Sequence, residues 1–135
     1  MARLLLMEDD AEEGELLAEI IRRDGHEVVL LPNATACFAH LETHPVDLLL
    51  SDIFVKEDGQ HVPNGGLLLI SKLRQIDHIS SQKLPIIAIS GGFAIKGGAS
   101  ALRAARDVGA DVLFEKPVPI DELLLTIREL LQRDA

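Results

Sequence analysis

Short apolar runs alternate along this chain with segments whose apolar residues recur at helical spacing. The runs that read as strands are Arg3–Met7, Glu27–Leu31, Val46–Ser51, Leu84–Ile89 and Asp111–Phe114. The segments with helical spacing are Ala11–Asp24, Asn33–Thr43, Gly66–Ile76, Ser100–Val108 and Pro119–Arg133. This regular alternation predicts an α/β fold in which five parallel strands form one sheet with helices on both faces.

The strands are apolar along nearly their whole length, which is typical of a parallel sheet because helices cover both of its faces. A length of 135 residues suits one domain, and a hydrophobic content of 47% is enough for one buried core. We therefore expect a single domain spanning residues 1–135, with a (βα)5 doubly wound five-stranded parallel sheet and no output domain.

Charge and cysteine content restrict the environment and the partners. The net charge of −9 disfavours direct binding to nucleic-acid phosphates, but it permits binding of a cation or of a basic protein surface. The lone Cys37 excludes an internal disulfide and suits a reducing compartment. No apolar run approaches the length of a membrane span, and the N-terminus lacks the pattern of a signal peptide. We expect a cytoplasmic protein that binds neither nucleic acid nor membrane.

Polar residues follow four of the predicted strands. Glu8-Asp9-Asp10 follows the first strand and Asp52 the third, while Ser90-Gly91-Gly92 and Glu115-Lys116-Pro117 lie at the ends of the fourth and fifth. The carboxyl ends of parallel strands share one edge of a sheet, and ligands of open α/β sheets bind at that edge. The sequence therefore predicts one site that contains all four segments.

The residue types at this edge indicate a particular chemistry. Two carboxylates about 4 Å apart repel each other by roughly 4 kcal/mol at an effective dielectric constant of 20, so an acid cluster favours a bound cation. A ligand set made only of oxygen favours Mg²⁺ or Mn²⁺. The Ser90 hydroxyl and the Lys116 ammonium suit the oxygens of a phosphoryl group, and a carboxylate such as Asp52 can itself be the nucleophile.

Each segment taken alone also fits a structural role. Acids such as Glu8-Asp9-Asp10 favour the start of a helix, and Asp52 suits a solvated turn. Ser90 before two glycines and Lys116-Pro117 are both typical of turns. The combination is less readily accidental, because the four segments occur in order at the ends of four strands.

In this order and spacing, the motifs resemble the receiver domains of bacterial two-component response regulators over essentially the whole chain. The segments that carry the resemblance are Leu5–Asp10, Leu48–Asp52, Ile87–Gly91, Gly109–Asp111 and Lys116-Pro117. The resemblance implies a flavodoxin-like fold with strand order 2-1-3-4-5.

The resemblance also implies roles for individual residues. Asp52 would accept the phosphoryl group and would bind Mg²⁺ together with Asp9. Glu8 would lie near the metal, through water, and the backbone carbonyl of Phe54 would be a further ligand. Asp10 is expected to cap the first helix rather than to bind metal.

Two more residues complete the implied site, and one position departs from the family pattern. Ser90 takes the place of the switch hydroxyl, Lys116 contacts the phosphoryl group, and the Lys116-Pro117 peptide bond is expected to be cis. Leu113 stands where the family often has an aromatic switch residue, with Phe114 beside it. Leu113 is therefore interpreted as a core residue, and two alternatives stay open: a serine–aromatic switch, or a switch that runs through backbone movement near Ser90.

The implied function is that of a phosphorylation-controlled signalling domain. A sensor histidine kinase or a histidine phosphotransfer protein would donate the phosphoryl group. The surface of Ser100–Val108, Asp111–Phe114 and Pro119–Arg133 would then change and bind a downstream protein or relay the phosphoryl group. The protein would be a monomer or a weak, phosphorylation-dependent homodimer, with no catalysis beyond its own phosphorylation and dephosphorylation.

The sequence leaves two other functions possible, and it leaves two interpretations of the long segment after Asp52. The chain could be a receiver-like scaffold that is never phosphorylated, or a Mg²⁺-dependent phosphatase that uses an aspartyl phosphate. Against the phosphatase, Phe54 stands two residues after Asp52, where a general acid would be expected. The long polar segment Phe54–Asn64 is either a solvated loop or a flap over Asp52.

Overall fold

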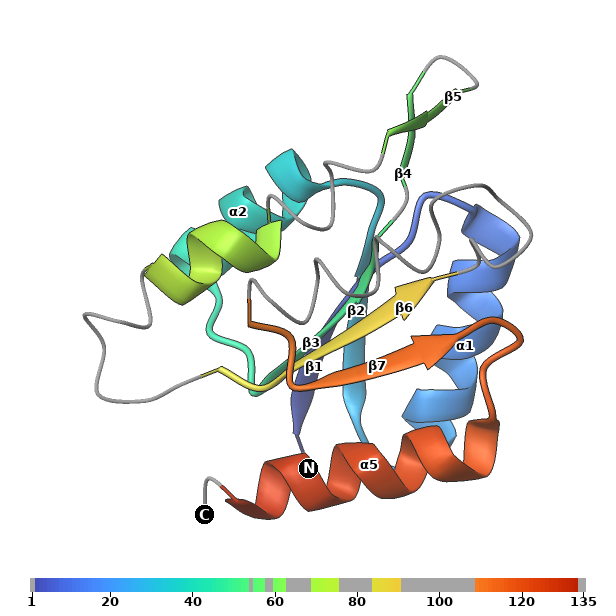
Figure 1. Ribbon diagram of the computed structural model, residues 1–135. Helices are drawn as coiled ribbons and strands as arrows, with labels where there is room; N and C mark the ends of the chain where they lie inside the picture. Colours follow the sequence, from blue (N-terminus) through green and yellow to red (C-terminus); the bar gives the residue numbers. More distant parts are fainter. Residues whose placement is uncertain are drawn as a thin grey trace.

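The computed structural model describes residues 2–53, 55–57, 60–62, 69–75, 84–90 and 109–133. Within these residues, one sheet contains five parallel strands in the order β2-β1-β3-β6-β7 (Figure 1). The strands are β1 (Arg3–Met7), β2 (Glu27–Leu31), β3 (Leu48–Asp52), β6 (Ile86–Ser90) and β7 (Val112–Glu115). Counted along the chain within this sheet, the order is 2-1-3-4-5, so the predicted flavodoxin-like fold is confirmed.

Helices cover both faces of the sheet, as the apolar strands predict. They are α1 (Ala11–Arg23), α2 (Ala34–Thr43) and α5 (Ile120–Arg133), together with the helical residues 69–75. The helices α1 and α5 lie on one face of the sheet, and α2 and residues 69–75 lie on the other (Figure 1). Their buried side chains belong to two separate core clusters. No helix in the described part of the chain combines the length and the apolar character that a membrane span requires.

The central strand β3 shows why the sheet is rigid where the site lies. All five of its residues are buried, and alternate side chains enter opposite layers: Leu49 joins the α2 side, while Leu48 and Leu50 join the α1 and α5 side. Complete burial of one leucine contributes roughly 1.5–3 kcal/mol. Asp52, the last residue of this strand, is therefore held by a part of the molecule that has little freedom to move.

The segment after β3 contains two strands that the sequence pattern did not predict. β4 (Val55–Glu57) and β5 (Gln60–Val62) pair as an antiparallel hairpin with Val55 opposite Val62. The pairing is compatible with both alternatives for this segment, a solvated insertion and a flap over Asp52. Two β-branched residues around an Asp-Gly pair, Asp58-Gly59, are a recognised hairpin pattern. In Figure 1 the hairpin extends beyond the end of β3.

One arginine fixes the starts of β6 and β7. The Nε of Arg74 donates to the Gly109 carbonyl at 2.8 Å, its Nη1 to the Leu84 carbonyl at 2.6 Å, and its Nη2 to Asp111 Oδ2 at 2.8 Å. The same Asp111 oxygen accepts the Ile86 backbone N–H at 2.8 Å. We call this set of contacts the Arg74 clamp. It sets the positions from which both strands run toward the opposite edge of the sheet.

The predicted helix over residues 100–108 lies outside the described residues, as do both ends of the helix predicted over residues 66–76.

Candidate functional site

The parallel register brings the polar strand ends together. Met7 pairs with Ser51, so Glu8 and Asp52 follow as neighbours at the carboxyl edge of β1 and β3. Asp52 in turn pairs with Ile89, the residue before Ser90. Glu8, Asp52 and Ser90 are only 7%, 4% and 1% exposed. Three of the predicted site residues therefore lie buried at one edge of the sheet.

Three carboxylates form a compact oxygen cluster there. Glu8, Asp9 and Asp52 each offer one oxygen, and these oxygens lie within 4.8 Å of one another. Asp9 is the partly exposed member, on the solvent side of the two buried acids. A ligand set made only of carboxylate oxygens, with no sulfur or imidazole, fits a hard cation such as Mg²⁺.

Asp10 does not belong to this cluster. Its Oδ1 accepts the backbone N–H of Glu13 at 3.0 Å, and it is the N-cap of α1. The prediction that Asp10 caps the first helix is confirmed, because its side chain accepts a backbone N–H of the first helical turn.

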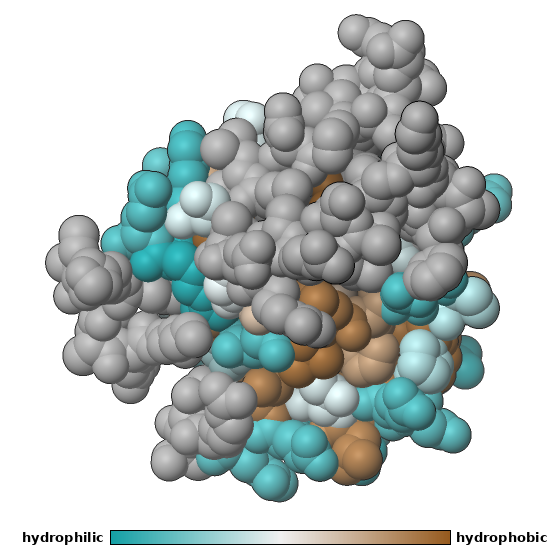
Figure 2. Space-filling view, in the orientation of Figure 1, coloured by the Kyte–Doolittle hydropathy of each residue, from teal (hydrophilic) through white to brown (hydrophobic). Residues whose placement is uncertain are grey.

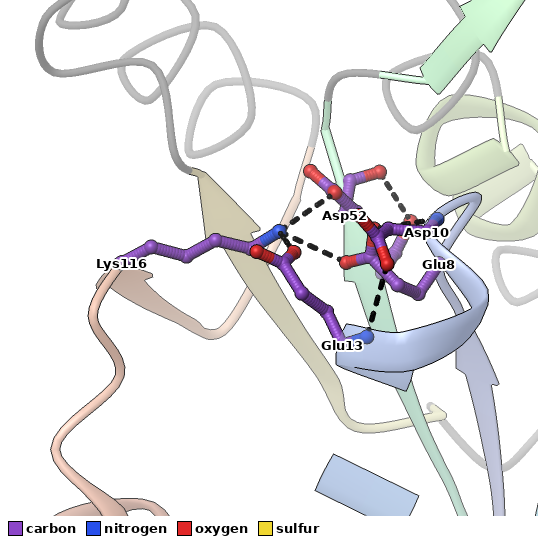
Figure 3. A network of polar contacts seen from close by, with 6 residues as sticks. Glu8, Asp10, Glu13, Asp52 and Lys116 are labelled. Carbon is purple, nitrogen blue, oxygen red and sulfur yellow. Dashed lines mark hydrogen bonds and ion pairs between the residues drawn. The ribbon is translucent and has the colours of Figure 1, made fainter. Parts of the chain in front are cut away.

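Lys116 reaches the acids from the other side of the site (Figure 3). Its Nζ lies 3.0 Å from Glu8 Oε2, 3.2 Å from Asp52 Oδ2 and 2.8 Å from Glu13 Oε2. The Lys116 backbone N–H donates to the Ser90 carbonyl at 2.8 Å, which ties the lysine to the end of β6. The Lys116-Pro117 peptide bond is cis, as predicted.

Glu8 and Asp52 are buried side by side, and Lys116 alone does not offset the cost of ionising both of them. Burial, followed by the charge of Asp52 and a hydrogen bond with it, raises the pKa of Glu8 to about 8, although Lys116 acts in the opposite direction. Without a cation, burial and the charge of Asp52 therefore favour the protonated form of Glu8 more than in a solvated glutamate. A divalent cation would replace that proton with two positive charges, which is a second reason why the site fits a metal.

Lys116 remains a cation throughout the physiological range. Burial by itself lowers the pKa of its ammonium group, but the hydrogen bond to Glu13 and the charges of Asp52 and Glu8 outweigh burial and raise the pKa above its ordinary value. The site therefore presents a fixed positive charge beside the Asp52 carboxylate.

Two further predicted positions have different outcomes. Leu113 packs against the core layer on the α2 side, whereas Phe114 is buried in the layer formed with α1 and α5. The aromatic ring next to Leu113 thus lies on the opposite face of the sheet, and the interpretation of Leu113 as a core residue agrees with the structure. Phe54, the expected carbonyl ligand, lies outside the described residues.

Glu13 is the residue that the strand-end pattern does not identify. It lies in the first turn of α1, where an acid is expected simply to favour the helix dipole. The first turn of α1 directly follows the acidic end of β1, so its side chains reach the same edge of the sheet. That position is the signal in the sequence that points to Glu13.

Comparisons with known proteins show which family the chain resembles in sequence. The response regulator receiver protein CpdR of Brucella abortus is 28% identical over 132 residues, which cover 97% of this chain and 98% of that protein. The transcriptional regulatory protein CpxR of Klebsiella pneumoniae is 28% identical, over 98% of this chain and 50% of that protein. The chain thus spans about half the length of CpxR, and likewise 46% of a response regulator receiver protein of Anaeromyxobacter.

Solved structures share the fold. A putative response regulator from Chloroflexus aurantiacus has a TM-score of 0.80 and 25% identity, with 97% of this chain and 98% of that chain covered. The receiver domain of NtrX from Brucella abortus has a TM-score of 0.77 and 26% identity, over 96% of this chain and 98% of that chain. The family model for the response regulator receiver domain matches residues 4–128. The chain therefore belongs to the response regulator receiver domain family.

Proposed function

We propose that this receiver domain accepts a phosphoryl group on Asp52, with Mg²⁺ as cofactor, from a sensor histidine kinase or a histidine phosphotransfer protein. One observation carries the proposal. The buried Asp52 carboxylate lies 3.2 Å from the Lys116 ammonium, and its oxygen is within 4.8 Å of oxygens of Glu8 and Asp9. A nucleophile, a fixed cation and a set of metal ligands therefore meet at one place.

In the proposed step, a carboxylate oxygen of Asp52 attacks phosphorus. One O–P bond forms and the P–N bond of a phosphohistidine breaks. In the reacting donor, the nitrogen of the histidine ring that is not bonded to phosphorus carries a proton. The nitrogen that loses phosphorus keeps the electron pair of the P–N bond, so the histidine side chain leaves as a neutral imidazole. Lys116 stays protonated and neutralises a phosphoryl oxygen, while the Ser90 hydroxyl donates a hydrogen bond to another.

Asp9, Asp52 and Glu8 would hold the metal, together with the backbone carbonyl of Phe54. Bound Mg²⁺ supplies positive charge that offsets the charge of the phosphoryl oxygens. The buried position of Asp52 and Ser90 limits the access of bulk water, so the charges at the site act on one another more strongly than they would in solution.

The output surface is proposed to include β7, α5 and residues 100–108. Figure 2 shows apolar surface over β7 and part of α5 in the orientation of Figure 1, with hydrophilic residues below it and to its sides. On α5, the Leu125 side chain is 55% exposed. An apolar patch with a polar rim suits a downstream protein or a second copy of the domain.

The test is the intact mass of the protein after incubation with acetyl phosphate and Mg²⁺. The wild-type protein should gain one phosphoryl group, with release of acetate, and the gain should require Mg²⁺. Asp52→Asn should gain none, because an amide is a far weaker nucleophile than a carboxylate.

The matched control is Asp47→Asn, the same chemical change at the opposite edge of the sheet. Asp47 accepts the Arg3 backbone N–H at 2.8 Å, and an asparagine oxygen can do the same. This variant should be phosphorylated like the wild type. Absence of an adduct with acetyl phosphate and with phosphoramidate would contradict the proposal and favour the receiver-like scaffold.

A further inference from the structure

We propose that Glu13 is a positioning residue that holds Lys116 in the unphosphorylated protein and competes with the incoming phosphoryl group for it. This inference rests on the proposed phosphorylation of Asp52. It gives α1 a direct part in setting the rate of that reaction.

Each N–H donor of the Lys116 ammonium group has a carboxylate partner. An ammonium group has three N–H donors, and the Lys116 Nζ lies 2.8–3.2 Å from three carboxylates, those of Glu8, Glu13 and Asp52. The contact with Glu13 is the shortest, at 2.8 Å. A phosphoryl oxygen can therefore gain a hydrogen bond from Lys116 only if one carboxylate gives up its own.

The exposure of the three side chains indicates which carboxylate gives up its hydrogen bond with Lys116. The Glu8 and Asp52 side chains are 7% and 6% exposed, whereas the Glu13 side chain is 57% exposed. Water can replace the lysine around Glu13 at little cost, but it cannot reach the two buried acids as readily. The bond between Lys116 and Glu13 is consequently the one that opens.

The cap of α1 explains why Glu13 is available for this contact. An acid three residues after an N-cap often turns back to accept the backbone N–H of the cap residue. Here Glu8 Oε1 accepts the Asp10 N–H, at 3.1 Å, so that role is already taken. The Glu13 carboxylate is free of the helix start and extends to Lys116 (Figure 3).

Charge gives the direction of the effect. A phosphoryl group on Asp52 adds negative charge beside Lys116, and the Glu13 carboxylate repels that charge while it also occupies the lysine. Removal of the Glu13 charge should therefore speed phosphorylation by an anionic donor. An exposed ion pair contributes about 0.2–1 kcal/mol, which corresponds to a rate increase of roughly 1.5-fold to 5-fold.

The experiment measures the rate of adduct formation with acetyl phosphate and Mg²⁺ for the wild type, Glu13→Gln and Glu12→Gln. Glu12→Gln removes the same charge from the adjacent exposed residue, for which the described part of the chain offers no ion-pair partner. Glu13→Gln should react faster than the wild type by the factor given above, and Glu12→Gln should match the wild type. Equal rates for the two variants, or a slower Glu13→Gln, would overturn the inference.

A second measurement does not depend on phosphorylation. Nitrogen NMR of lysine-labelled protein follows the exchange of the Lys116 ammonium protons with water. Exchange should be faster in Glu13→Gln than in Glu12→Gln, because one of the three hydrogen bonds is lost, and Glu13→Asp should fall between them. Unchanged exchange in Glu13→Gln would overturn the inference, whereas a missing adduct in every protein would overturn only the proposed function.

Discussion

At the scale of single residues, Glu8 has several separate contacts in the site. One of its oxygens accepts the Asp10 N–H at 3.1 Å, and the other lies 3.0 Å from Lys116 Nζ. The same carboxyl group faces the buried Asp52. It therefore stabilises the start of α1, pairs with the lysine and senses the charge on the proposed phosphoacceptor.

The raised pKa of Glu8 predicts how stability depends on pH in the presence of a chelator. In the folded state the pKa is about 8, above the ordinary value of 4.5, so the folded state binds more protons between these values. The contribution of Glu8 to the free energy of unfolding is complete below about pH 4.5 and decreases as pH rises toward 8. Urea unfolding at pH 6 and pH 8 measures the loss.

Asp52→Asn supplies the comparison that isolates Glu8 from the histidines. The variant retains the burial of Glu8 but removes the neighbouring charge, so it should lose less stability than the wild type between pH 6 and pH 8. It should also be more stable than the wild type at pH 8. Asp47→Asn should keep the wild-type pH dependence. An identical dependence in all three proteins would show that Glu8 and Asp52 are not coupled in this way.

The site residues differ in how readily the sequence reveals them. Glu8, Asp52 and Ser90 can be predicted because each directly follows or ends an apolar run, and the sheet then brings the strand ends together. Glu13 contacts a lysine 103 residues away, and an acid in a first helical turn has an adequate local explanation. Periodicity cannot report such a contact, because it depends on how a helix and a distant loop are placed in space.

At the scale of elements, the Arg74 clamp depends on a glycine. Gly109 has a φ of +118°, and a Cβ at this position would lie 2.7 Å from Arg74 Cγ. Gly25 has a similar φ of +101°, but no atom lies within 4 Å of the place its Cβ would take. An alanine at Gly25 would therefore introduce backbone strain alone, whereas an alanine at Gly109 would introduce backbone strain and a steric conflict with Arg74.

Replacement of each glycine by alanine should have unequal costs. Gly25→Ala should lower the free energy of unfolding by about 1–2 kcal/mol, the cost of the left-handed conformation. Gly109→Ala should cost roughly 1–3 kcal/mol more, because displacement of Arg74 leaves partly buried hydrogen-bonding groups without this partner. Urea unfolding of both variants provides the measurement, and equal losses would mean that the clamp adjusts without cost.

The hairpin of β4 and β5 shows where prediction from composition fails. The polar composition of Phe54–Asn64 indicated a solvated loop or a flap and did not indicate two strands. Val55 pairs with Val62, and the sequence between the two strands holds Asp58-Gly59, a turn signal that hydrophobic periodicity does not detect.

At the scale of the whole molecule, apolar strands were sufficient to predict a parallel sheet with two covered faces. Leu49 and Leu50 enter different layers of the core, so neither face can be left to solvent. The strand order came from the family resemblance, because alternation alone is compatible with several orders. The described helices α1, α2 and α5 lie close to their predicted ranges, since each has an N-terminal signal or an apolar face.

Binding of Mg²⁺ should stabilise the whole fold. The metal would bind the folded arrangement of Glu8, Asp9 and Asp52, whose oxygens the sheet brings within 4.8 Å of one another. At a concentration of one hundred times the dissociation constant, the gain is about 2.7 kcal/mol. Thermal melting should therefore shift upward with Mg²⁺ but not with K⁺ at equal ionic strength. An unchanged melting temperature would contradict the metal site.

Because the core is divided into two layers, the Cys37 thiol can serve as a chemical probe for the opening of one of them. Its side chain is completely buried between α2 and the sheet, and burial raises the pKa of the thiol to about 12. A thiol reagent can reach the sulfur only after this layer separates from the sheet. The rate of modification then counts the openings of one half of the molecule, independently of α1 and α5. In a chain without Trp or Tyr, this single atom reports a motion that intrinsic fluorescence cannot follow.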